Sequence, residues 1–298
     1  MKYISVNEAS VKWEVTPRVI RGYCEEGRIP GAFKEGRTWN IPCDSKKPER
    51  KKKKGKIPTD LLERLRMEKE SHLPDGIYHK VQIDFAYNSN HIEGSKLSHE
   101  QTRYIFETNT IGFESTAVNV DDIIETANHF RCVDYIIDNA NRTLTERMIK
   151  QLHLMLKSGT SDSRKPWFAT GDYKRIENEV GGNITAPPDE VPVEMAALIS
   201  EYNKKEEKTL EDLLEFHHSF EAIHPFQDGN GRIGRLILFK ECLRNNICPF
   251  IIEDEYKQFY YRGLSEWTRE KGYLLDTCLT EQDRFRSALD YFGIGYTD

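Results

Sequence analysis

Residues His224–Arg235 bring an imidazole, a carboxylate, three glycines and two guanidinium groups into consecutive positions. Gly229 and Gly231 can adopt positive φ, so backbone N–H groups of this segment can approach an anion closely. Arg232 and Arg235 lie three residues apart and share one helix face, from which both can bind phosphate oxygens. The spacing predicts a binding site for a polyphosphate.

His224 and Asp228 supply the reactive groups beside this anion site. An imidazole titrates at about 6.5 in the reference state, so His224 can accept a proton near neutral pH. Asp228 offers a hard oxygen ligand of the kind that Mg²⁺ takes together with substrate phosphates. A general base, a metal ligand and an anion site are together typical of an enzyme that transfers phosphoryl or nucleotidyl groups.

Two apolar helices must flank and position this segment. The apolar residues before it recur at helical spacing, and the run after it is typical of a buried helix that begins near Gly231. The second helix would direct its free N–H groups and positive dipole end toward the phosphates. The two patterns consist of Leu213, Leu214, Phe216, Phe220 and Ile223, and of Leu236, Ile237, Leu238, Phe239 and Leu243.

Other ligand sites are weaker interpretations of the same residues. A calcium loop of the EF-hand type beginning at Asp228 lacks the glycine and the glutamate required at its sixth and twelfth positions. A Walker phosphate loop fails because no Gly-Lys-Ser/Thr follows the glycines. A metal site on His217, Glu221 and His224 stays conceivable, although no further Cys or Asp completes it.

The whole segment resembles the signature of the Fic family, His-x-Phe-x-(Asp/Glu)-Gly-Asn-Gly-Arg-x-x-Arg, at every signature position. The upstream residues His217, Phe220, Glu221 and Ile223 also resemble the usual lead-in of that family. The resemblance implies transfer of AMP from ATP to a Ser, Thr or Tyr hydroxyl of a target protein, with His224 as the catalytic base. It implies that ATP and Mg²⁺ bind through Asp228, Gly229, Asn230, Gly231, Arg232 and Arg235, with Asp228 on the metal.

Ser89, Glu93 and Gly94 match a second Fic pattern, (Ser/Thr)-x-x-x-Glu-(Gly/Asn), which the autoinhibited members carry on a helix. The resemblance implies an inhibitory helix near residues 85–94, N-terminal to the catalytic core in the same chain. A carboxylate paired with Arg235 would occupy the guanidinium that the γ-phosphate needs, so ATP would bind only in an unproductive pose. Contacts within a homo-oligomer, or self-modification near this helix, are candidate triggers that relieve Glu93.

Residues 158–192 interrupt the helical pattern with clustered Gly, Asn and Pro, which predicts a hairpin or an exposed loop. In the Fic family the matching region is the flap, a β-hairpin that binds the target protein by strand addition and tolerates varied target sequences. Tyr260 and Tyr261 fall where the family has a tyrosine-rich helix along the adenine, although an aromatic stripe is also typical of a plain core. The expected flap contacts to the nucleotide are Asn178, Glu179, Val180 and Gly181.

Residues 1–45 form a separate small module. Start signals at Ser5 and Thr16 predict two short helices, and residues 29–42 have the pattern of a hairpin. This order resembles the winged helix-turn-helix modules of excisionase-like and MerR-like proteins, which lay their second helix in the major groove of DNA. A protein-docking module that does not bind DNA is the alternative. The expected DNA contacts are Arg18, Arg21, Lys34 and Arg37.

Residues 46–58 are predicted to be a basic linker between this module and residues 59–298. Residues 46–56 contain eight basic residues and one acidic residue, in a chain whose net charge is −6. Such a segment is typical of a solvated boundary between domains. A flexible basic arm could also contact DNA phosphates.

The composition is that of an ordinary globular protein, with 38% hydrophobic and 31% charged residues among 298. No run approaches eighteen apolar residues, so we expect no membrane span, and the N-terminus has no signal-peptide core. Six cysteines without a Cys-x-x-Cys pair are typical of reduced thiols. We therefore expect a cytoplasmic protein.

Together these patterns predict a mainly α fold, an all-α Fic-type helical bundle with a β-hairpin flap, preceded by the winged helix-turn-helix module. The favoured function is an autoinhibited protein adenylyltransferase. Three alternatives stay open: removal of AMP at the same site with Glu93 positioning a water, another nucleotide donor, or a DNA-binding regulator whose Fic core senses nucleotides. Further helices are expected over residues 77–90, 97–110, 119–140, 143–156 and 279–291.

Overall fold

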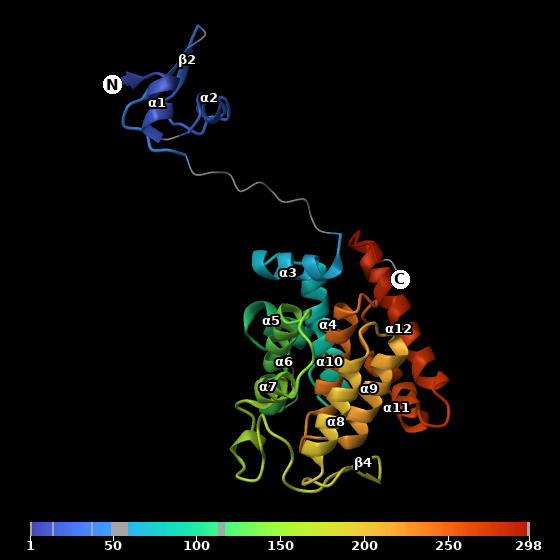
Figure 1. The fold of residues 1–298 in the computed structure, drawn as a ribbon. Coiled ribbons are helices and arrows are strands. Elements are labelled where there is room, and N and C mark those ends of the chain that lie inside the picture. Colours follow the sequence, from blue (N-terminus) through green and yellow to red (C-terminus); the bar gives the residue numbers. More distant parts are fainter. Residues whose placement is uncertain (1, 14, 37, 49–58, 113–116, 297–298) are drawn as a thin grey trace. The chain divides into compact units, whose positions relative to one another are not determined.

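The chain divides into two compact units, residues 1–56 and residues 57–298. Most of the described residues lie in helices, and the strands form small antiparallel sheets. Within these residues no helix combines the length and apolar character needed to cross a membrane. The computed structural model describes residues 2–13, 15–36, 38–48, 59–112 and 117–296 (Figure 1).

The first unit combines two short helices with a three-stranded antiparallel sheet of order β1-β3-β2. Ser5 and Glu8 cap the first helix reciprocally, because Ser5 N–H donates to Glu8 Oε2 (2.7 Å) and Glu8 N–H donates to Ser5 Oγ (3.3 Å). Two helices and a hairpin lie at the residues where the sequence predicts them, around their own apolar core. The elements are β1 Tyr3–Ile4, α1 Val6–Trp13, α2 Pro17–Glu25, β2 Phe33–Glu35 and β3 Thr38–Pro42.

The second unit is a helical bundle that contains a two-stranded hairpin. Its helices are α3 Leu61–Ser71, α4 Ile77–Ile92, α5 His99–Thr108, α6 Val120–Asp138, α7 Glu146–Lys157, α8 Val191–Lys204, α9 Leu210–Ile223, α10 Asn230–Arg244, α11 Lys257–Glu266 and α12 Gly272–Tyr291. The short elements are the 3-10 turns η1 Asp162–Arg164 and η2 Asp254–Tyr256, with the strands β4 Glu179–Val180 and β5 Asn183–Ile184. Helix α10 packs against α4, α6, α7 and α9 and lies among them in Figure 1.

The two helices that flank the predicted phosphate loop form close to their expected positions. Thr209 and Asp212 make a reciprocal cap at the start of α9. Helix α10 begins at Asn230, and all its residues from Arg232 to Leu243 are buried. Because α10 is enclosed by neighbouring helices, the packing fixes the direction in which its N-terminus points.

Helix α4 ends earlier than the inhibitory helix predicted near residues 85–94. Its last residue is Ile92, Glu93 is the C-cap, and Gly94 adopts a φ of 98°. A glycine with positive φ at this position is a common way to end a helix. The Glu93 carboxylate therefore comes from the C-cap residue of α4.

Other helices also differ from the predicted ones. Helix α12 starts at Gly272, before the predicted residue 279, because Leu274 and Cys278 extend its buried face. The tyrosine-rich helix expected at Tyr260 and Tyr261 is α11. Helix α8 was not among the expected elements. The linker residues 49–58 lie outside the described residues.

Candidate active site

The loop between α9 and α10 borders a pocket of about 870 Å³, within the size range of small-molecule sites. Its lining residues are Glu93, Val180, Gly181, Ile184, Thr185, His218, Glu221, Ala222, His224, Gly231, Arg235, Tyr260, Tyr261, Arg262, Leu264 and Ser265. Among the predicted site residues, the pocket lining does not include Ser89, Gly94, Asn178, Glu179, Asp228, Gly229, Asn230 and Arg232.

His224 ends α9 in a left-handed backbone conformation with φ 52°. Its Nδ1 lies 3.3 Å from the carbonyl oxygen of Glu221. Because a carbonyl can only accept, this contact places the proton on Nδ1 and leaves the Nε2 lone pair open. Burial, assisted by the Lys174 cation, lowers the pKa of His224 to about 4. The imidazole is therefore neutral at pH 7 and can accept a proton through Nε2.

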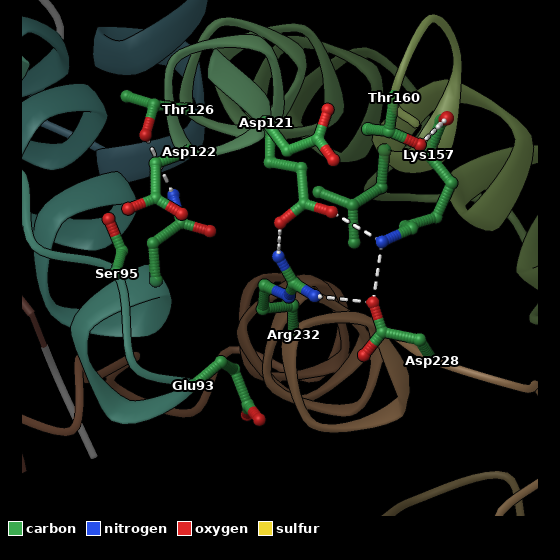
Figure 2. A network of polar contacts seen from close by, with 12 residues as sticks. Glu93, Ser95, Asp121, Asp122, Thr126, Lys157, Thr160, Asp228 and Arg232 are labelled. Atoms are coloured by element: carbon green, nitrogen blue, oxygen red, sulfur yellow. Dashed lines mark hydrogen bonds and ion pairs between the residues drawn. The ribbon is translucent and has the colours of Figure 1, made fainter. Parts of the chain in front are cut away.

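Asp228 belongs to a network of charged side chains contributed by several elements (Figure 2). Its Oδ2 accepts hydrogen bonds from Lys157 at 2.5 Å and from Arg232 at 3.2 Å. Both cations also contact Glu125 of α6, and Lys157 lies 3.2 Å from Asp162. Lys157 and Arg232 are 1% and 4% exposed. The network therefore fixes Asp228 between two buried cations.

The Asp228 carboxylate suits a metal that is shared with bound phosphates. Burial opposes its ionisation, but the Arg232 and Lys157 cations hold the pKa of Asp228 well below its usual range. Its side chain is 46% exposed, so a carboxylate oxygen can reach a ligand. Mg²⁺ in nucleotide sites commonly takes one or two carboxylates together with phosphate oxygens and water, and this residue fits that pattern.

A metal site formed by protein side chains alone is absent from the part of the chain that the structure describes. No group of three or more His, Cys, Asp or Glu residues is placed there to hold a metal ion. The conceivable site on His217, Glu221 and His224 therefore does not form. Its spacing along α9 is regular, but these side chains have different neighbours: His217 Nε2 lies 2.7 Å from Tyr260 Oη.

The glycines and Asn230 shape the loop and the start of α10. Asn230 accepts a hydrogen bond from Phe226 N–H and donates one to Phe226 O, both at 2.8 Å, so its amide holds the loop closed. Gly229 has φ 86°, which favours glycine. A Cβ at Gly231 would lie 2.3 Å from Glu93 Oε1. Glycine at this position therefore allows the carboxylate to rest against the N-terminus of α10.

Arg235 is bound from the side of α4. Its Nη2 donates to Glu93 Oε1 at 2.7 Å and to the carbonyl of Ser89 at 2.9 Å, and its Nε donates to Ser89 Oγ at 3.1 Å. Arg235 is only 4% exposed. The predicted residues Ser89 and Glu93 therefore share one guanidinium, at the helix end where an anion would bind.

Tyr260 and Tyr261 both line the pocket, with different surroundings. Tyr260 is buried against His217, whereas Tyr261 is 45% exposed and its hydroxyl donates to the Ile92 carbonyl at 3.2 Å. Tyr261 therefore connects α11 to the end of α4. Beside them, burial raises the pKa of Glu221 to about 8, so this carboxyl is mostly protonated at neutral pH.

The predicted flap is a short hairpin whose strands pair Glu179 with Ile184 and Val180 with residue 183. Gly181 and Gly182 have φ of 56° and 80°, as a two-residue turn of type I′ requires. Val180 and Gly181 reach the pocket lining. Asn178 instead lies at the base of the hairpin, where its Nδ2 donates to Phe226 O at 2.9 Å.

The predicted DNA contacts belong to the first unit. Arg18 and Arg21 are exposed on α2, and Lys34 is exposed on β2. Arg37 lies outside the described residues.

Several residues of the site were not predicted from the sequence. Glu125 and Lys157 enter from α6 and α7, and Lys174 comes from a loop without any periodic pattern. Lys157 follows Leu156 in the apolar part of α7, so a charge beside a core position was an available signal. Glu125 carries no comparable signal.

Comparison with known proteins gives three kinds of similarity. Residues 143–241, about a third of the chain, match the model of the Fic/DOC family. The relative named protein adenylyltransferase Fic from Aedes aegypti is 25% identical over 185 residues, which cover 61% of this chain and 36% of that protein. The Drosophila melanogaster protein of the same name is 28% identical over 194 residues, with 62% and 37% covered. The chain therefore spans about a third of the length of these relatives.

Solved structures show a similar arrangement of helices. A Fic domain containing signaling protein from Bacteroides thetaiotaomicron aligns with a TM-score of 0.62 and 25% identity, covering 78% of this chain and 95% of that one. Fic-1 from C. elegans aligns with a TM-score of 0.60 over 80% of this chain and 71% of that one, and its 18% identity supports the fold alone. The mainly helical fold is thus that of Fic-domain structures.

Proposed function

We propose that this chain is an autoinhibited protein adenylyltransferase, which moves AMP from ATP to a Ser, Thr or Tyr hydroxyl of a target protein. The observation that carries this proposal is the position of His224. His224 lines the same pocket as Gly231 and Arg235, beside the N-terminus of α10, and its Nδ1 contact leaves Nε2 open to accept a proton. A neutral base and an anion site in one pocket suit nucleotidyl transfer.

In the proposed reaction the ATP phosphates lie on the α10 N-terminus and on the two arginines, Arg232 and Arg235. His224 Nε2 takes the proton of the target hydroxyl as its oxygen attacks the α-phosphorus. The new bond joins that oxygen to the α-phosphorus, and the bond to the bridging oxygen breaks to release pyrophosphate. Asp228 would hold Mg²⁺, which when bound neutralises charge on the phosphate oxygens. Tyr260 and Tyr261 would line the adenine of ATP.

Autoinhibition in this proposal arises from competition for one guanidinium. The Glu93 carboxylate lies 2.7 Å from Arg235 Nη2 and against Gly231. An incoming γ-phosphate would need the Arg235 guanidinium and the space beside Gly231. A charge-assisted hydrogen bond contributes ~1.5–3 kcal/mol. If it must break before ATP binds productively, the penalty is about ten- to a hundredfold.

The test is labelling with ATP radiolabelled at the α-phosphate, in Mg²⁺, with the chain itself and a cell lysate as acceptors. Glu93→Gly should incorporate label, wild type should incorporate about ten- to a hundredfold less, and Glu93→Gly with His224→Ala should incorporate none. Equal labelling by the double variant would contradict the assignment of His224 as base.

The same experiment addresses two alternatives, removal of AMP instead of its transfer and the use of a nucleotide donor other than ATP. The relatives are named adenylyltransferases, which supports the forward reaction with ATP. If no variant takes up label, release of AMP from a modified protein and transfer from other nucleotides become the favoured reactions. In the proposal the target protein adds a strand to the flap, where Glu179 and Val180 are exposed.

A second proposed activity belongs to the first unit, which we infer to bind DNA through α2. Exposed Arg18 and Arg21 on that helix, and exposed Lys34 on β2, support the inference. Binding of fluorescent duplex DNA by the whole chain should weaken with salt and with Arg18→Ala plus Arg21→Ala. Equal binding by wild type and this double variant would favour a protein-docking module.

A further inference from the structure

We propose that Lys174 is a positioning residue that ties the base of the flap to the segment carrying His224, so that the flap and the catalytic base are held as one unit. The proposal rests on the proposed function for its catalytic meaning, while its structural content can be measured independently. Lys174 lies before the hairpin and is only 3% exposed.

The ammonium of Lys174 joins both ends of the flap. Its Nζ donates to Asn178 Oδ1 and to Thr185 Oγ1, each at 2.6 Å. Asn178 directly precedes β4 and Thr185 directly follows β5, so the ammonium closes the hairpin at its base. Thr185 Oγ1 also lies 2.9 Å from the Asn178 carbonyl.

The same residues hold the chain on both sides of His224. Lys174 Nζ donates to Ile223 O at 3.4 Å, and Lys174 N–H donates to Pro225 O at 2.9 Å. Asn178 Nδ2 donates to Phe226 O at 2.9 Å. Carbonyls immediately before and after the histidine therefore bind the flap base, and displacement of one part would strain the other.

Lys174 also places a positive charge near the imidazole. Burial lowers the pKa of His224 most, the Glu221 carbonyl opposes that effect, and the Lys174 cation adds to it. The carboxylates of Glu93 and Asp228 act in the opposite direction. Removing the lysine charge should therefore raise the pKa of His224.

The acceptors of the Lys174 ammonium are neutral oxygens, which makes the residue suitable for substitution. Lys174→Met therefore does not strand a hydrogen-bonded carboxylate. Removal of one partner of a buried ion pair, in contrast, would leave a charge without its partner. Arg175→Met is the matched control, because Arg175 is the next residue, is exposed, and loses the same charge. Lys174→Arg keeps the charge and several donors.

Two measurements on the whole chain test the proposal. The first follows the His224 ring by ¹³C NMR across pH, assigned by the signal lost in His224→Ala. The second follows hydrogen exchange of the flap amides, residues 179–184. In Lys174→Met the pKa of His224 should rise by about 1 unit and flap exchange should quicken about tenfold. Lys174→Arg should restore both, and Arg175→Met should change neither.

Thr185→Val separates the two effects, since it removes the hydroxyl that bonds Lys174 and Asn178 and keeps the lysine charge. Flap exchange should quicken while the pKa of His224 stays unchanged, and this variant serves if Lys174→Met does not fold. Unchanged values in folded Lys174→Met, or equal effects in Arg175→Met, would overturn the proposal. Neither readout needs AMP transfer, so failure of the labelling experiment above would leave this result intact.

Discussion

Glu125 contacts both buried cations of the site, Arg232 and Lys157, as Asp228 also does. Removing the sole partner of a buried charge typically costs ~3–5 kcal/mol. Glu125→Gln leaves Asp228 beside both cations, so its cost should lie at the lower end of that range. We therefore expect Glu125→Gln to lower the free energy of unfolding by about 3 kcal/mol in denaturant titrations.

Glu100→Gln is the matched control for this prediction. Glu100 pairs with Arg103 on the surface of α5, where the two side chains are 53% and 42% exposed. Solvent screens such a pair, so the change should lower the free energy of unfolding far less than Glu125→Gln does. Equal losses from the two substitutions would show that the Glu125 network does not stabilise the fold.

A second residue-level prediction concerns the acid side of the pH–rate profile. The pKa of His224 is lowered to about 4, so the imidazole stays neutral, and able to accept a proton, as the pH falls well below 6.5. In Glu93→Gly, initial rates of AMP transfer at pH 5.5 and 7.5 should agree within about twofold. A tenfold lower rate at pH 5.5 would indicate an unshifted histidine.

At the scale of elements, the contact between α11 and α12 positions the pocket tyrosines. A Cβ at Gly263 would lie 2.7 Å from the Leu274 Cα, and this backbone atom cannot rotate away. Gly263→Ala should separate the two helices, lower the stability by ~1–3 kcal/mol and weaken ATP binding, as measured by thermal unfolding and calorimetry. The exposed Gln258→Ala on the same helix should change stability by less than about 0.5 kcal/mol. Equal effects would contradict this account.

The elements near the catalytic loop were the most predictable from sequence, for a physical reason. Helices α9 and α10 have long apolar faces and a loop with glycines at positions that need them, and both are local signals. The pairing of the buried charges of Glu125 and Lys157 could not be predicted in this way. They come together only when α6, α7 and α10 pack, and no local pattern records that packing. Glu93 was predicted from a sequence motif. Its position at the end of α4 depends on the backbone conformation of Gly94, which the motif does not specify.

At the scale of the whole second unit, three buried histidines make stability depend on pH. Burial lowers the pKa of His129, His153 and His217 to about 3, below the unfolded value of about 6.5. The unfolded chain therefore binds more protons below pH 6.5, and stability falls as the pH falls. The expected loss is on the order of 1 kcal/mol per pH unit for each histidine.

Thermal unfolding between pH 7 and 5 measures this dependence. His129→Gln should give a shallower slope of unfolding free energy against pH than wild type, whatever its effect on stability at pH 7. His72→Gln, at an exposed position, is the matched control. Identical slopes in all three proteins would mean that His129 titrates normally.

The contact of Glu93 with Arg235 also has a consequence at the scale of the whole molecule, because it can link the binding of ATP to the binding of a partner. If ATP must displace this carboxylate to bind productively, then any partner that binds the displaced form is linked to ATP by thermodynamic reciprocity. Whatever factor such a partner contributes to nucleotide affinity, the nucleotide contributes the same factor to the affinity of the partner. The chain would then hold that partner more tightly when ATP is abundant, even before any AMP has been transferred.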